Sequence, residues 1–126
     1  MKIQESAENY LETILILGQD DNPVRSIDIV NELKFSKPSV SVAMKNLRER
    51  NLVEIDSAGH ITLTKEGRKI AESVYERHVL LSSWLIQLGV DKEIAANDAC
   101  GMEHSISEES YLAIKKHIEE HNSNSN

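Results

Sequence analysis

Several features that define other protein classes are missing from this sequence. It contains a single cysteine, Cys100, and no apolar run approaches the roughly 20 residues that span a bilayer. One cysteine excludes an internal disulfide and favours a reducing compartment. The first residues, MKIQESAENY, lack the charged and apolar segments of a secretory signal peptide. We therefore expect a cytoplasmic protein that does not associate with membranes.

A basic excess is also absent. The net charge of the 126 residues is −7, which argues against indiscriminate nucleic-acid binding. The charge is uneven, because residues 1–70 carry a net charge of −1 and residues 71–126 carry −6. Between residues 37 and 50 lie one acid and four basic residues: Lys37, Lys45, Arg48 and Arg50. DNA binding is therefore expected only in the first half.

Motifs of common enzymes are absent as well. The sequence has no H-E-x-x-H, no glycine-rich phosphate loop and no Ser/His/Asp grouping. The remaining enzymatic hypothesis is a metallohydrolase with Glu103 as general base, which needs an open coordination position and a substrate pocket. The sequence therefore favours a protein that is not an enzyme and takes no small organic substrate.

Helical periodicity dominates the chain. Apolar spacing predicts helices over about 5–18, over a short stretch capped by Ser26, from Ser36 to about 50, and over 65–88, 92–105 and 108–120. Thr64, Asp91 and Ser107 are the expected N-caps of the last three helices. Residues 52–64 instead alternate around the turn Asp56-Ser57-Ala58-Gly59, which is typical of a β-hairpin. The tail, 121–126, is expected to be disordered.

Two helices separated by a tight turn and followed by a hairpin indicate a winged helix-turn-helix. The fold class is therefore mainly α, with a DNA-binding domain over 1–70 and a helical domain over 71–120, linked by helix 65–88. The second helix of such a motif enters the major groove of DNA. The expected DNA contacts lie on that helix and just before it: Ser36, Lys37, Pro38, Ser39, Ser41, Lys45 and Arg48.

Metal-binding residue types gather at helical spacings. Cys100, Glu103 and His104 stand at i, i+3 and i+4 and share one face of a helix. Asn9 and Glu12 are three residues apart on the first helix, and His78 interrupts an apolar stripe. Thiolate, imidazole and carboxylate together suit Fe(II), Co(II), Ni(II) or Zn(II).

The segments SAENYLETILIL, SKPSVS, LTKEGRKIA, ERHVLLSSWL and NDACGMEH resemble the metal-dependent repressors of the diphtheria toxin repressor and manganese transport regulator family over residues 4–120. The resemblance implies a homodimer with a helical dimerisation domain. It also implies a divalent metal that enables binding to a palindromic operator of metal-uptake genes. By position, the family's metal ligands fall on Asn9, Glu12, His78, Cys100, Glu103 and His104.

The chain departs from both branches of that family. The manganese type has acids at the positions of Asn9 and Cys100, and the iron type has cysteine at position 100. Ser82 and Ala96 replace two ligands of the iron type's ancillary site, which leaves a binuclear variant on Glu12, His78 and Glu103 as an alternative. An SH3-like third domain is not expected.

Cys100 makes Fe(II) the first expected metal and Mn(II) the second. The alternative function is a metal-independent winged-helix repressor in which Cys100 senses oxidants, and this requires an accessible thiolate of low pKa.

Overall fold

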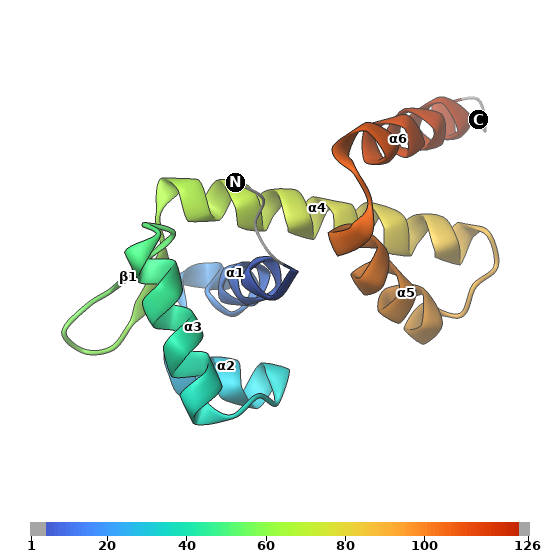
Figure 1. The fold of residues 1–126 in the computed structure, drawn as a ribbon. Helices are drawn as coiled ribbons and strands as arrows, with labels where there is room; N and C mark the ends of the chain where they lie inside the picture. Colours follow the sequence, from blue (N-terminus) through green and yellow to red (C-terminus); the bar gives the residue numbers. More distant parts are fainter. Residues whose placement is uncertain (1–4, 124–126) are drawn as a thin grey trace. The chain divides into compact units, whose positions relative to one another are not determined.

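The computed structural model describes residues 5–123 and divides the chain into two units, with the boundary between Ser73 and Val74. The N-terminal unit contains α1 (Glu5–Leu17), η1 (Gln19–Asp21), α2 (Ser26–Leu33), α3 (Lys37–Glu49), β1 (Val53–Ile55) and β2 (Ile61–Leu63). Helix α4 (Lys65–Gln87) begins in this unit and continues into the C-terminal unit, where α5 (Lys92–Ser105) and α6 (Glu108–Ser123) follow (Figure 1). Within residues 5–123 we find no helix with the length and apolarity to cross a membrane.

The predicted fold class is confirmed, and residues 5–123 contain no SH3-like domain. In the N-terminal unit α1, α2 and α3 contact one another, and β1 and β2 form an antiparallel hairpin in which Val53 pairs with Leu63. Buried apolar side chains from all these helices and both strands form one core, with Leu11, Ile29, Val40 and Ile61 among them. This core positions α3 and the hairpin as the two elements that a winged helix needs.

Most predicted helix caps are confirmed. Ser36 Oγ accepts the N–H of Ser39 at 3.2 Å, Thr64 Oγ1 accepts that of Gly67 at 3.0 Å, and the Asp91 and Ser107 side chains cap α5 and α6. The prediction for α2 was wrong by one residue. Its N-cap is Arg25, whose backbone N–H donates to Asp28 Oδ2 at 2.9 Å. The Asp28 carboxylate three residues on binds that N–H, so Ser26 lies inside the helix.

A close backbone approach joins α4 to the hairpin. A Cβ atom added at Gly67 would lie 1.9 Å from the carbonyl oxygen of Leu52, so no larger residue fits this position without a backbone shift. The Leu52 carbonyl also accepts the N–H of Thr64 at 3.1 Å. Gly67 thus lets the first turn of α4 pack directly against the chain that enters β1.

In the C-terminal unit α4 makes polar contacts with the segments that follow it, beside buried apolar side chains such as Leu81 and Ala99. Arg77 lies over the Tyr111 ring, 5.0 Å from its centroid, and donates to the Ile106 carbonyl at 3.3 Å. Glu76 accepts hydrogen bonds from Tyr111 and Lys115 on α6. Helix α6 runs to Ser123, three residues beyond its predicted end, and residues 124–126 of the predicted tail lie outside the described residues.

Candidate metal centre

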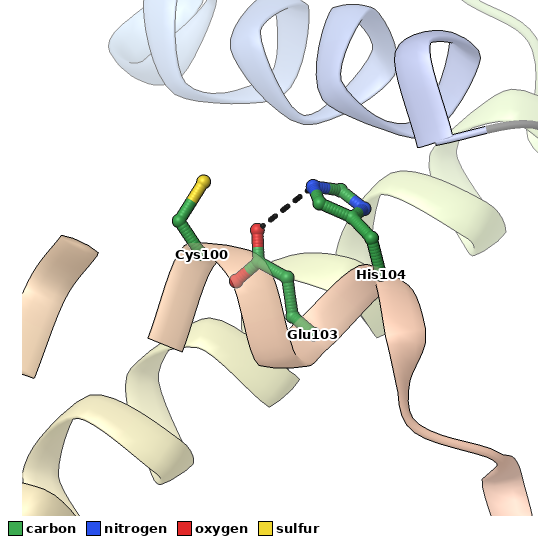
Figure 2. Close-up of side chains that lie close together, drawn as sticks. All are labelled: Cys100, Glu103 and His104. Carbon is green, nitrogen blue, oxygen red and sulfur yellow. Dashed lines mark ion pairs between the residues drawn. The ribbon is translucent and has the colours of Figure 1, made fainter. Parts of the chain in front are cut away.

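Helix α5 brings a thiol, a carboxylate and an imidazole to one patch (Figure 2). The ligand atoms of Cys100, Glu103 and His104 all lie within 4.8 Å of one another. This follows from the i, i+3, i+4 spacing, which places the three side chains on one helical face. Asp91 caps the start of this helix by accepting the N–H of Glu93. The predicted grouping of these three residues is therefore local in origin.

Glu103 is the centre of the patch. Its side chain is 0% exposed, and its two oxygens face different imidazoles. His78 Nδ1, on α4, donates to Glu103 Oε2 at 2.9 Å, and His104 Nε2 lies 3.3 Å from Oε1. A fully buried carboxylate is costly unless charged or hydrogen-bonding groups compensate it. The structure therefore brings the predicted His78 into contact with the α5 donors through Glu103.

The donors fit a divalent transition metal. The His104 side chain is 2% exposed and that of His78 is 32% exposed, whereas Cys100 is exposed at the rim. Two imidazoles, one carboxylate and one thiol on a partly buried patch match the nitrogen, oxygen and sulfur ligands of such ions.

Asn9 and Glu12 lie one turn apart on α1, in the N-terminal unit. Glu12 is buried, and the backbone carbonyl of Asn9 accepts a hydrogen bond from Thr13 Oγ1 at 2.8 Å. Their spacing places both on one helical face, as predicted. Their participation in one site with the residues of the C-terminal unit stays a prediction, and so does the binuclear variant.

All predicted DNA contacts lie on the exposed surface of the N-terminal unit. They are Ser36 at the N-cap of α3 and, along that helix, Lys37, Pro38, Ser39, Ser41, Lys45 and Arg48. Helix α3 buries Val40, Met44 and Leu47, which fixes the opposite side outward. Its exposed side offers hydroxyls and positive charges, which are the groups that bind phosphates.

Sequence reasoning missed Val42. This apolar side chain on α3 is 59% exposed, between the positions of Ser41 and Lys45. The i, i+3 relation to Ser39 and Lys45 was the signal, because residues at that spacing share a face. A valine there is suited to contact a thymine methyl group in the major groove.

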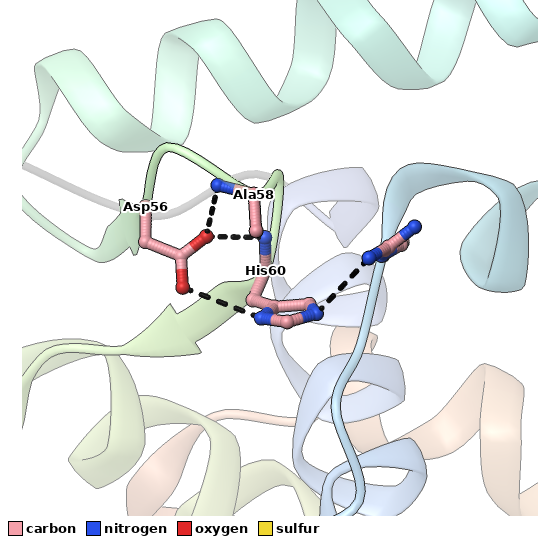
Figure 3. Close-up of polar contacts among 4 residues, drawn as sticks. Asp56, Ala58 and His60 are labelled. Atoms are coloured by element: carbon pink, nitrogen blue, oxygen red, sulfur yellow. Dashed lines mark hydrogen bonds and ion pairs between the residues drawn. The ribbon is translucent and has the colours of Figure 1, made fainter.

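A second missed feature lies at the hairpin turn (Figure 3). Asp56 Oδ1 accepts the backbone N–H groups of Ala58 and His60, both at 2.9 Å, and Asp56 Oδ2 lies 3.3 Å from His60 Nδ1. Arg25 Nη2 lies 3.3 Å from His60 Nε2, which must act as the acceptor because a guanidinium only donates. The hydrogen bond from the His60 backbone is the largest cause that lowers the pKa of Asp56.

Two family models match the chain, one in each half. Residues 2–61 match the iron dependent repressor N-terminal DNA binding domain, and residues 64–125 match the iron dependent repressor metal binding and dimerisation domain. The transcriptional regulator MntR of Escherichia coli is 36% identical over 118 residues, which cover 94% of this chain and 76% of that protein.

Two solved structures share the fold closely. The manganese regulator SloR matches with a TM-score of 0.80 and 28% identity, over 94% of this chain and 55% of that one. A manganese-dependent transcriptional repressor in complex with manganese matches with a TM-score of 0.80 and 27% identity, over 87% of this chain and 51% of that one. The chain thus spans about half the length of these two solved chains.

Proposed function

The chain belongs to the diphtheria toxin repressor and manganese transport regulator family of metal-dependent DNA-binding repressors, and from this premise we propose that a divalent metal bound around Glu103 enables it to bind an operator. The observation that carries the proposal is the fully buried Glu103 carboxylate between two imidazoles. Such a group is costly to bury for packing alone. A metal-binding role explains why the charge is there.

The proposed ligands come from both units: Asn9 and Glu12 from the N-terminal unit, and His78, Cys100, Glu103 and His104 from the C-terminal unit. When bound, the metal supplies two positive charges and a fixed arrangement of ligands. Ligands from both units around one ion would restrict the units to one arrangement. Selection of one arrangement couples metal binding to DNA binding, and operator DNA must then strengthen metal binding by the same factor. Couplings of this kind are typically about 1–3 kcal/mol.

We assign a homodimer to the active form. The C-terminal unit leaves several large apolar side chains exposed: Val79, Ile86, Leu88, Ile94 and Leu112. Val79 and Ile86 are seven residues apart on α4 and share a face. Exposed apolar side chains in such number favour burial against another subunit. The match of this unit to a dimerisation domain supports that assignment.

A symmetric dimer suits a palindromic operator. Two recognition helices fit two half-sites when these lie about one helical turn of DNA, roughly 34 Å, apart. On each subunit the exposed side of α3 would contact the half-site through the residues predicted above, with Val42 added. The target genes proposed on the resemblance are those of metal uptake, and a regulator that binds the chromosome would act in the cytoplasm.

The metal is proposed to be Mn(II) or Fe(II). The names of the similar proteins point to manganese and do not support a preference for Fe(II). The expectation of Fe(II) rests on Cys100, whose thiolate suits softer ions than Mn(II). A direct competition of Mn(II) and Fe(II) for the protein distinguishes the two arguments. Stronger binding of Fe(II) would support the argument from Cys100, and stronger binding of Mn(II) would support the argument from the similar proteins.

The test is an anaerobic pull-down of fragmented host genomic DNA by the purified protein, without metal and with Mn(II), Fe(II) or Zn(II). Selective retention of a few fragments only with metal is expected, and the most effective ion identifies the preferred metal. Equal retention with and without metal would contradict metal activation and favour the redox hypothesis for Cys100, which peroxide treatment then tests. No selective retention under any condition would refute the DNA-binding function.

A further inference from the structure

Helix α6 carries a second set of metal-binding residue types that the α5 cluster does not use. Residues 117–121 have the sequence HIEEH, which places His117, Glu120 and His121 at i, i+3 and i+4. Cys100, Glu103 and His104 have the same spacing on α5, with cysteine in the first position. We propose that His117, Glu120 and His121 form a second binding site for a divalent transition metal, separate from the α5 cluster.

The two imidazole rings lie side by side on α6. The rings of His117 and His121 are 15° from parallel, and their centroids are 6.3 Å apart. Two imidazoles that bind one ion through nitrogens at about 2.0–2.1 Å place their centroids roughly 5 Å apart. The rings therefore need to approach by only about 1 Å. Both side chains are exposed, so side-chain rotation can supply this movement without a change in the backbone.

A shallow pocket gives the site a wall. The two histidines and Ile118 line a cavity of about 160 Å³ together with Trp84, Gln87 and Leu88 at the end of α4. The indole and leucine side chains shield one side of the pocket from water, which strengthens electrostatic interactions there. The two imidazoles offer nitrogen donors, and Glu120, which shares their helical face by its i, i+3 spacing from His117, can offer a carboxylate after side-chain rotation. Coordination positions remain for water. The site is therefore suited to a solvent-accessible ion.

The donor chemistry selects a class of ion. Two imidazoles and one carboxylate suit Zn(II), Ni(II), Cu(II) or Co(II), and the usual order of stabilities ranks Mn(II) and Fe(II) below these ions. The α5 cluster adds a thiol, which the α6 site lacks. The two sites should therefore differ in metal preference, and the α6 site should take up ions that compete with the activating metal. This inference does not depend on the function proposed for the α5 cluster.

Trp84 provides a built-in reporter, because it is the only tryptophan in the sequence and lines the same pocket. The full chain, stripped of metal, is titrated with Ni(II), whose unpaired electrons quench indole fluorescence. The titration is carried out in the Glu103→Gln/His104→Gln double variant, which lacks two donors of the α5 cluster. We expect saturable quenching by one Ni(II) per chain. His117→Gln or His121→Gln in this background should raise the midpoint on the order of 10-fold or more, because even partners of metal ligands change affinity 10–100-fold.

Glu119→Gln is the matched control for Glu120→Gln, because both remove one exposed acid from the same turn of α6. Glu119→Gln should leave the midpoint unchanged, whereas Glu120→Gln should raise it. As a second measurement, wild-type protein dialysed against Ni(II) should retain one more ion per chain than His117→Gln. The inference is overturned if the double variant shows no saturable quenching while wild-type and His117→Gln retain equal nickel. It is also overturned if both histidine variants keep the midpoint. Metal-dependent DNA binding is measured separately and is unaffected by either result.

Discussion

Glu103→Gln tests the central role of the buried carboxylate. Glutamine has nearly the same size and keeps one carbonyl oxygen, but it removes the charge that lies between His78 and His104. Loss of a hydrogen-bonding partner of a metal ligand weakens metal binding 10–100-fold, so loss of a charged donor should weaken it by at least about 100-fold. The variant should therefore lose nearly all metal dependence.

The effect on thermal stability follows from linkage. At a metal concentration of about 100 times the dissociation constant, binding stabilises the wild-type protein by about 2.7 kcal/mol. A 100-fold weaker site retains only about 0.4 kcal/mol at the same concentration. For a chain of this size each kcal/mol moves the midpoint of thermal unfolding by roughly 3–5 °C. The metal-induced shift should thus fall from roughly 8–14 °C to about 1–2 °C.

The assay is thermal unfolding followed by circular dichroism, with and without Mn(II). Without metal, the variant should differ from wild type by only about 1 kcal/mol, which is the difference between a charge-assisted and a neutral hydrogen bond. Glu93→Gln, an exposed acid in the first turn of the same helix, is the control and should keep the full metal-induced shift. A full shift in Glu103→Gln would show that the carboxylate is not a ligand and would refute the assignment.

Three further predictions concern the N-terminal unit. Gly67→Ala places a methyl group 1.9 Å from the Leu52 carbonyl oxygen, so urea denaturation should show a loss of about 3 kcal/mol or more; an unchanged midpoint would contradict the packing. Ser36→Ala removes the cap of α3 and should cost about 1 kcal/mol in the same assay, with Ser41→Ala on the exposed face of α3 as a near-neutral control for stability. The pKa of the Asp56 carboxyl is lowered in the folded protein. The ionised carboxylate therefore stabilises the fold above its unfolded-state pKa of about 3.9, and this stabilisation is lost as pH falls through the pKa in the folded protein. Asp56→Asn should therefore show a weaker loss of thermal stability than wild type on acidification below about pH 4, and identical profiles would rule out the contribution.

Features that depend on neighbours in sequence were predictable from the sequence. The i, i+3, i+4 spacing places Cys100, Glu103 and His104 on one face of any α-helix, so their grouping needs no tertiary contact. The cap of α3 at Ser36 and the hairpin around Gly59 likewise depend on a few adjacent residues. The fold class followed because hydrophobic periodicity records which face of each element is buried.

Other features depend on contacts between distant segments, and only the tertiary structure decided them. His78 reaches Glu103 across 25 residues, and Arg25 reaches His60 across 35. Val42 is exposed although it is apolar, because Val40, Met44 and Leu47 already fill the side of α3 that faces the core. The sequence determined which donors α5 offers. Packing of α4 against it determined that one of them, Glu103, is fully buried between two imidazoles, because burial and charge compensation arise only when separate helices meet.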